Sequence, residues 1–218
     1  MNGILIINKP AGITSHCVVN IIRKKFGIRR VGHAGTLDPM ATGVLVILVG
    51  KATKLSAKII NDNKEYIARV FLGKSTDTQD STGRVIEEKA IGDISIKDIK
   101  RIFNSFLGES AQMPPMVSAK KYGGTRLYKL ARKGEYVKRK SCRIKIERID
   151  ILDYRIPEII FKVNCSKGTY IRTLCEDIGK KLGYPAHLSS LIRTKSGRFS
   201  IEESCELEKV GKKDLKTI

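Results

Sequence analysis

The amino-acid sequence predicts an α+β fold in which strands and helices are mixed along the chain. In some segments apolar and polar residues alternate, which is typical of strands. In others apolar residues recur every three or four positions, which is typical of amphipathic helices. The chain has 218 residues, of which 41 % are hydrophobic, so it can bury a core as one large domain or two small ones. Because neither an internal repeat nor a low-complexity linker interrupts it, we expect a single domain over residues 1–218.

Three elements are predicted in the first 50 residues. Residues 3–7 are a short apolar run that fits a strand, and residues 43–50 are a β-branched run, apolar on both faces, that fits a central strand. Between them lies a helix that Thr14 or Ser15 can cap and that Gly27 ends. The predicted core stripe of this helix consists of Val18, Ile21, Ile22 and Phe26.

The rest of the chain alternates between strands, helices and loops. Ser95 and Asp98 form a capping box at the start of an amphipathic helix, and Gly108 is its expected C-cap. Thr169 opens a second long helix that ends near Gly183. The other expected elements are a strand at 66–72, a loop at 73–83, an extended stretch from 112, a short helix within 127–133, strands at 144–152 and 159–165, and a last strand at 194–201.

The chain carries a large positive charge that is concentrated in one segment. Lys and Arg number 42 against 22 Asp and Glu, which gives a net charge of +20. Residues 112–145, the basic lobe, contain eleven of these cations and a single acid, Glu135, and thus carry half of the excess. A field of this sign attracts polyanions, either nucleic acid or an anionic membrane surface. A solvated charged face is the alternative, but we favour a surface that follows nucleic-acid phosphates.

Several classes of protein and site are excluded by absent patterns. The longest apolar run, residues 43–50, is far shorter than the roughly 20 residues of a membrane-spanning helix, and the N-terminus lacks the basic start of a signal peptide. The five cysteines are scattered without CxxC spacing, which favours reduced thiols in the cytoplasm over a zinc site. The sequence has no complete phosphate-binding loop, no GxGxxG, no GxSxG and no His pair at metal-ligand spacing. We therefore expect neither a metal nor a redox cofactor.

One segment, residues 32–43 with the sequence GHAGTLDPMATG, has the composition of a catalytic or binding loop. Its glycines permit sharp turns and close approach to a ligand. Pro39 biases Asp38 toward an extended conformation, and a single carboxylate presented just before a rigid strand is well placed to act as a nucleophile. A structural Asx-turn is the more common use of Asp in loops, and from composition alone it is the stronger interpretation.

The same segment strongly resembles the signature of the TruB family of pseudouridine synthases, which convert uridine 55 of tRNA to pseudouridine. Five further segments resemble family motifs in the same order, namely NKPAGITS at 8–15, VGKATKL at 49–55, Tyr66 with GKSTDT at 73–78, QMPP at 112–115 with SAKK at 118–121, and CSKGTYIR at 165–172. The resemblance runs from about residue 3 to residue 200. It implies a pseudouridine-synthase fold, with a mixed, mostly antiparallel central sheet flanked by helices and loops, and an isomerase that needs no cofactor.

The resemblance implies roles for six residues. Asp38 aligns with the catalytic aspartate, and Arg172 is expected to pair with it. Tyr66 aligns with the tyrosine that stacks on the target base and can serve as a general base. The other expected substrate-binding residues are His33, which helps remodel the RNA loop when the target is flipped out, Tyr170, and Leu191, which lines the uridine pocket. By composition alone, a hydrophobic core is the stronger interpretation for Tyr66 and Leu191, whereas Tyr170 fits either role.

The resemblance further implies that the basic lobe grips the TΨC arm of tRNA. The expected contacts to the RNA backbone are Lys120, Lys121, Arg126 and Lys129. Longer relatives carry a second RNA-binding domain, and because only 17 residues follow Ile201 we expect no PUA-like domain here, either in a natural short form or because the chain stops early. Ile192 replaces a family arginine, from which we expect weaker tRNA affinity. We also expect a monomer in the cytoplasm.

Two activities from different classes fit these features. One is a tRNA uridine isomerase, and the other is a non-catalytic tRNA-folding chaperone, which needs only the grip and the base flip. Both can belong to one protein. A protein of the membrane surface fits less well, because no basic helix has the broad apolar face that such a site requires.

Overall fold

The computed structural model describes residues 1–217, which form two compact units. Unit 1 contains residues 1–67 together with the chain from residue 191 onward, and unit 2 contains residues 68–190. Strands β4 (Lys64–Leu72) and β12 (Ala186–Ser196) each begin in one unit and end in the other. That the whole chain acts as a single catalytic domain stays a prediction.

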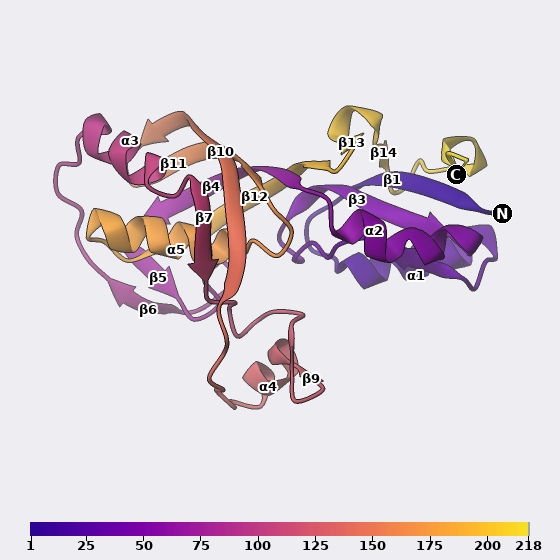
Figure 1. Cartoon of the computed structure of the whole chain (residues 1–218), viewed down its shortest axis with the longest axis horizontal. Coiled ribbons are helices and arrows are strands. Elements are labelled where there is room, and N and C mark those ends of the chain that lie inside the picture. Colours follow the sequence, from indigo (N-terminus) through magenta and orange to yellow (C-terminus); the bar gives the residue numbers. More distant parts are fainter. Residues whose placement is uncertain (218) are drawn as a thin grey trace. The chain divides into compact units, whose positions relative to one another are not determined.

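Unit 1 is built on strands in the order β14–β1–β3–β12 (Figure 1). β1 (Gly3–Lys9) and β3 (Thr42–Val49) pair antiparallel, from Gly3 opposite Val49 to Lys9 opposite Gly43. β3 also pairs with β2 (Val31–His33), antiparallel, and with β12, parallel. The unit further contains α1 (Ser15–Phe26), α2 (Ser56–Ile60), β13 (Phe199–Ser200), β14 (Cys205–Glu206) and 3-10 helices at Gly50–Leu55, Ile201–Glu203 and Lys212–Asp214.

The core of unit 1 lies on the predicted central strand and the predicted first helix. Every residue from Val44 to Val49 is fully buried, as expected for a strand covered on both faces. α1 begins after the N-cap Thr14, whose side chain accepts a hydrogen bond from the backbone N–H of Cys17, and it ends at Gly27 with a φ of +66°. Its buried apolar residues are Val18, Val19 and Ile22, whereas Ile21, predicted for the core stripe, is 41 % exposed.

In unit 2 the strand order is β4–β11–β10–β7. The long strand β10 (Cys142–Arg155) pairs antiparallel with β11 (Glu158–Cys165) on one side and with β7 (Gly108–Gln112) on the other. α3 (Ile96–Asn104) packs against α5 (Ile171–Leu182), and Phe103 of α3 meets Phe161 of β11 edge to face with 5.3 Å between ring centroids. A separate hairpin consists of β5 (Lys74–Thr76) and β6 (Val85–Glu88).

The basic lobe connects β7 to β10 and stands apart from the sheet of unit 2, as Figure 1 shows for β9 and α4. It contains the two-residue strands β8 (Lys121–Tyr122) and β9 (Thr125–Arg126), which pair antiparallel, and the short helix α4 (Leu127–Arg132). Leu127 is buried, whereas Tyr122 and Tyr136 are exposed. The short helix that the sequence predicts here is therefore present.

The predicted α+β class is confirmed, but three predicted boundaries are wrong. The expected loop at 73–83 contains β5, which is too short to show a hydrophobic period. The helix that follows Ser95 is capped by Ser105, and Gly108, the expected C-cap, begins β7 with a φ of +90°. The last long strand starts at Ala186 rather than Thr194. Within residues 1–217, no helix is long and apolar enough to cross a membrane.

Candidate active site

Asp38 lies on the loop between β2 and β3 of unit 1, where it is half-buried. The loop turns back on itself, since the N–H of Ala41 donates to the carbonyl of Asp38 over 3.1 Å. At its end, Gly43 has a φ of +98°, and a Cβ there would lie 2.3 Å from the carbonyl oxygen of Arg193. Both the backbone conformation and the close approach of β12 therefore require glycine at this position.

Lys9, at the end of β1, uses backbone carbonyls to link the Asp38 loop to the connection between β1 and α1. Its side chain is completely buried, and its Nζ donates to the carbonyls of Pro10 (2.7 Å), Ile13 (2.8 Å) and Pro39 (3.2 Å). An ammonium group has three donors, and all three are used here. Because Pro39 directly follows Asp38, this contact ties the candidate nucleophile to the first strand.

Ser15 adds a reciprocal pair of hydrogen bonds to the same loop. Its Oγ donates to the carbonyl of Leu37 over 3.0 Å and accepts from the N–H of Leu37 over 2.8 Å. Ser15 is the first residue of α1 and is itself buried. The residues before and after Asp38 are thus both held, Leu37 by the first residue of α1 and Pro39 by the last residue of β1.

Arg193 of β12 also holds the loop. It is only 1 % exposed, and its guanidinium donates to three backbone carbonyls, those of Val44 (2.7 Å), Gly35 (3.1 Å) and Thr36 (3.4 Å). The planar fork of donors suits several acceptors at fixed angles better than an ammonium does. One buried cation therefore spans both ends of the segment that presents Asp38.

The charges of Lys9, Arg193 and Asp38 lie close enough to interact. The pKa of Lys9 is lowered from 10.5 to about 8; burial is the largest cause, and repulsion by Arg193 acts in the same direction. Attraction by Asp38 and, less strongly, by Cys17 opposes this shift. The loop therefore combines one carboxylate with two buried cations, an arrangement in which each cation favours the ionised form of the acid.

The other predicted site residues of unit 1 lie on neighbouring strands. His33 is half-buried at the end of β2, opposite Ile47 of β3, and Tyr66 is half-buried on β4. Leu191 is buried on β12, two residues before Arg193, whereas Ile192 between them is 36 % exposed. Unit 1 thus contains four of the six predicted residues, and Tyr170 and Arg172 belong to unit 2.

Arg172 is part of a buried network within unit 2. Its guanidinium lies 3.6 Å from the carboxylate of Asp80, and both side chains are about 5 % exposed. It also donates to the carbonyls of Thr78 (3.1 Å) and Val117 (2.7 Å). Asp80 in turn accepts hydrogen bonds from the hydroxyl of Thr78 and from the N–H and hydroxyl of Thr82. The expected pairing of Arg172 with Asp38 stays a prediction.

Tyr170 is the N-cap residue of α5, which begins at Ile171 and not at Thr169 as the sequence predicts. The side chain of Gln112 holds its backbone, accepting from the N–H over 2.8 Å and donating to the carbonyl over 3.1 Å. Burial, the largest cause, raises the pKa of the phenol, whereas a hydrogen bond with Ser118 and the nearby charges of Lys120 and Arg172 partly oppose this. Because the pKa is raised, the phenol stays protonated at neutral pH, with Lys120 and Arg172 close to it.

The four predicted RNA-contacting cations of the basic lobe are not equivalent. Lys121, Arg126 and Lys129 are exposed. Lys120 is half-buried, and its Nζ contacts the Sγ of Cys142 at 2.5 Å and the carbonyl of Lys140 at 3.4 Å. The first three are therefore available to phosphates at little cost, whereas Lys120 would have to give up existing contacts.

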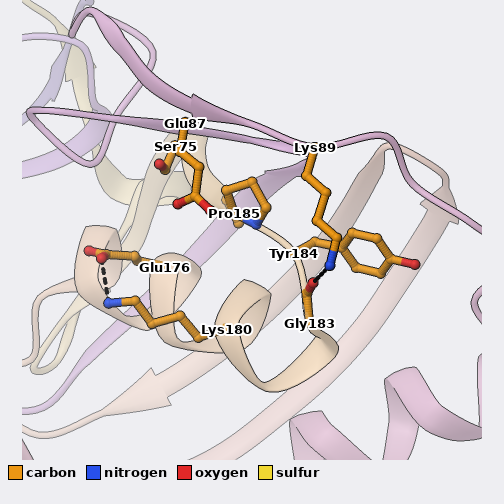
Figure 2. Close-up of a pocket in the computed structure, with 9 residues that line it drawn as sticks. Ser75, Glu87, Lys89, Glu176, Lys180, Gly183, Tyr184 and Pro185 are labelled. Carbon is orange, nitrogen blue, oxygen red and sulfur yellow. Dashed lines mark hydrogen bonds and ion pairs between the residues drawn. The ribbon is translucent and has the colours of Figure 1, made fainter.

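Unit 2 also contains a hollow of about 300 Å³ that the sequence did not predict (Figure 2). Charges of both signs line it: Glu176 forms an ion pair with Lys180, and Lys89 lies over the ring of Tyr184 while it donates to the carbonyl of Gly183. Its lining thus has no dominant charge. Among residues 1–217, no group of three or more His, Cys, Asp or Glu side chains could hold a metal ion.

Comparison with known proteins decides the family. A family model described as "TruB family pseudouridylate synthase (N terminal domain)" matches residues 23–171, and one described as "tRNA pseudouridylate synthase B C-terminal domain" matches residues 172–216. The chain belongs to the TruB family. Its motifs and its pseudouridine-synthase fold, both expected from the sequence, are thereby confirmed.

Individual TruB-family proteins are similar over nearly the whole chain. The tRNA pseudouridine synthase B of Syntrophotalea carbinolica is 51 % identical over 210 residues, which cover 96 % of this chain and 69 % of that protein. The tRNA pseudouridine synthase B of Clostridium tetani is also 51 % identical, over 99 % of this chain and 74 % of that protein.

Solved structures show the same fold. A chain in the crystal structure of a Cbf5–Nop10–Gar1 complex superposes with a TM-score of 0.75 at 33 % identity, over 94 % of this chain and 52 % of that one. A chain of an H/ACA RNP bound to a substrate RNA containing 2′-deoxyuridine gives a TM-score of 0.71 at 30 % identity, again over 94 % and 51 %. This TruB-family chain thus spans about half the length of each.

Three supporting residues of this TruB-family site were not predicted from the sequence: Lys9, Arg193 and Asp80. Lys9 lies in the segment 8–15 that carries part of the resemblance, and a lysine at the end of a strand, two residues after the apolar run 3–7, is a signal for a partnered charge. Asp80 lies two residues beyond the GKSTDT motif. Nothing local distinguishes Arg193 from the many other cations of the chain.

The pKa of Lys9 predicts how stability depends on pH. In the folded chain Lys9 loses its proton near pH 8, whereas in the unfolded chain it does so near 10.5. Between these values the unfolded state binds more protons, so the contribution of Lys9 to the free energy of unfolding rises with pH, by up to about 3 kcal/mol. Urea unfolding of the wild type and Lys9→Met from pH 7 to 10 should show that the free energy of unfolding of the wild type rises with pH relative to that of the variant. Parallel curves would contradict it.

Proposed function

We propose that this chain isomerises uridine 55 in the TΨC loop of tRNA to pseudouridine, with Asp38 as the nucleophile. The observation that carries this proposal is the single carboxylate of the β2–β3 loop, held by two buried cations through backbone carbonyls in a chain of the TruB family. We further propose a monomer that acts in the cytoplasm on the TΨC arm of tRNA.

The chemistry of the isomerisation suits such a site. The bond between N1 of uracil and C1′ of ribose breaks, the base turns while it stays captive, and C5 bonds to C1′. The hydrogen on C5 leaves as a proton and N1 takes up a proton, so atoms balance without any exchange of electrons. A carboxylate can attack covalently, or stabilise the charge that develops as the base leaves, only while it is ionised. The two neighbouring cations, Lys9 and Arg193, favour that form of Asp38.

The target uridine must first leave the RNA stack. Unstacking a base costs a few kcal/mol, and stacking on an aromatic ring offsets a similar amount. We propose that Tyr66 stacks on the extruded base, that Leu191 lines its pocket, and that His33 takes part in remodelling the loop. Support comes from their positions on β4, β12 and β2 of the unit that carries Asp38. We propose that Tyr170 and Arg172 contribute to substrate binding from α5.

The decisive experiment uses tRNA labelled with tritium at C5 of uridine. Formation of the C5–C1′ bond releases the label, so an isomerase releases tritium stoichiometrically from one site. Mass mapping of the product then shows which uridine has changed, and position 55 is expected. Binding and refolding of tRNA without release of tritium would refute the isomerase and favour the non-catalytic chaperone.

The basic lobe predicts a change in the salt dependence of tRNA binding. Each phosphate contact contributes about 0.7–0.9 to the slope of log K against log salt, so replacing Lys121, Arg126 and Lys129 by Gln should flatten it by about 2. Adding Lys120→Gln should change the slope less, because Lys120 already contacts Cys142 and Lys140. Replacing the exposed Lys97 and Lys100 of α3 is the control. A slope that stays at the wild-type value would mean that the RNA binds elsewhere.

A further inference from the structure

Gln79 adopts a backbone conformation that side chains disfavour. It has a φ of +64°, and it is the one non-glycine residue with a positive φ in the part of the chain that the structure describes. In this left-handed region the Cβ crowds the following carbonyl, so residues other than glycine remain there only when their surroundings enforce it. Gln79 lies in the turn between β5 and β6 and is not one of the residues that pair in this hairpin.

The enforcing contacts come from both ends of the Gln79 side-chain amide. Nε2 donates to the carboxylate of Glu176, and Oε1 accepts from the hydroxyl of Thr173 over 3.1 Å. Glu176 is itself oriented by Lys180, as the dashed line in Figure 2 shows. Both partners of Gln79 belong to α5, the helix that also carries Arg172. The side chain therefore clamps the β5–β6 turn onto this helix.

The residues on either side of Gln79 both contact Arg172. The carbonyl of Thr78 accepts from its guanidinium over 3.1 Å, and the carboxylate of Asp80 lies 3.6 Å from the same nitrogen. The backbone of Gln79 is fixed as well, because its N–H donates to Thr76 and its carbonyl accepts from Leu188. The clamp and the strained φ together direct both neighbours of Gln79 toward one buried cation.

We propose that Gln79 is a positioning residue for Arg172. Its clamp on Thr173 and Glu176 keeps the turn in the strained conformation in which Thr78 and Asp80 both face the guanidinium. When the clamp is lost, the turn relaxes toward an unstrained conformation and Arg172 loses part of its fixed orientation. This role rests on the proposed function, in which Arg172 contributes to the binding of the target uridine.

Two variants at this position separate positioning from folding. Gln79→Gly removes the clamp and also the strain, whereas Gln79→Ala removes the clamp and keeps the strain. Both should lower kcat for tritium release by about tenfold to a hundredfold, because misorientation in the site affects the chemical step. The KM for tRNA should stay within about twofold, since the basic lobe is unchanged. The melting temperature should fall more for Gln79→Ala than for Gln79→Gly, because glycine relieves the strain that alanine keeps.

A second pair of variants tests the route through α5. Thr173→Val replaces the hydroxyl with a methyl group of the same shape, and it should lower kcat less than Gln79→Gly. In the double variant the two losses should not add, because both changes remove the same clamp. Glu87→Gly, on the exposed strand β6, is the control for the flexibility that a glycine introduces, and its kcat should equal that of the wild type.

Three results would overturn the proposal. The first is a Gln79→Gly variant with the kcat of the wild type, the second is a fall of its melting temperature in step with its kcat, and the third is additive losses in the double variant. A wild-type chain that releases no tritium would overturn the proposed function and this role with it. If instead the wild type releases tritium and Gln79→Gly has the same kcat, only the proposed role of Gln79 is refuted and the proposed function stands.

Discussion

Asp38→Asn abolishes the release of tritium from C5-labelled tRNA, by at least about 10⁴-fold, while the affinity for tRNA stays within about twofold. The amide has the shape of the carboxylate but neither its charge nor its nucleophilicity. The loop should keep its conformation, because Lys9 and Arg193 donate to the backbone carbonyls of Pro39, Gly35 and Thr36, which the substitution leaves in place.

The control for this variant is Asp93→Asn, a change of an exposed carboxylate in unit 2. Both variants need the same tritium assay and a filter-binding titration with unlabelled tRNA.

A second consequence is electrostatic: attraction by Asp38 raises the pKa of Lys9, so in Asp38→Asn that pKa should fall below about 8. Continued release of tritium by Asp38→Asn would show that another group acts as the nucleophile.

Arg193→Met has the largest expected effect on stability. It leaves the carbonyls of Gly35, Thr36 and Val44 without the guanidinium that now donates to them, in a place that water does not reach. Unsatisfied buried acceptors cost about 1–3 kcal/mol each before relaxation, so we expect a loss of about 3 kcal/mol in the free energy of unfolding. Because the same loop presents Asp38, tritium release should fall by at least about a hundredfold.

Arg193→Lys is the matched control for charge. An ammonium on a flexible stem keeps the positive charge but cannot reproduce the planar fork, so both stability and activity should be intermediate. Urea unfolding and tritium release measure the two effects separately. If Arg193→Met unfolds at the wild-type urea concentration, the three hydrogen bonds do not stabilise the loop and the interpretation of Arg193 as its support is wrong.

Much of the fold could be predicted because the sequence pattern is local. The β-branched run of β3 and the spacing of Val18 and Ile22 on α1 each depend on neighbours within a few residues. The start of β12 could not be predicted in the same way. Residues 186–190 place His187 and two serines among apolar residues, and His187 is buried only because its ring bonds to the carbonyl of Lys74, far away in sequence.

The candidate nucleophile could be predicted, whereas its support could not. Asp38 lies in a Gly-rich motif whose composition and family resemblance can be read from the sequence. The contacts of Arg193 join residues about 150 positions apart, and those of Arg172 with Asp80 join residues about 90 apart. Such pairings follow from strand order and register, which hydrophobic periodicity does not specify. The strained φ of Gln79 likewise becomes visible only in the structure.

The way Lys9 and Arg193 hold the Asp38 loop has an evolutionary consequence. The six hydrogen bonds described above for these two side chains all end on main-chain oxygens, three of them in residues 32–43. Main-chain oxygens are the same whatever residue occupies a position, so substitutions at Thr36 or Met40 leave the anchoring intact. Side chains at these positions can therefore change during evolution, and with them the contacts to nucleotides, while Asp38 stays in position. Substitutions there need not mean that activity is lost.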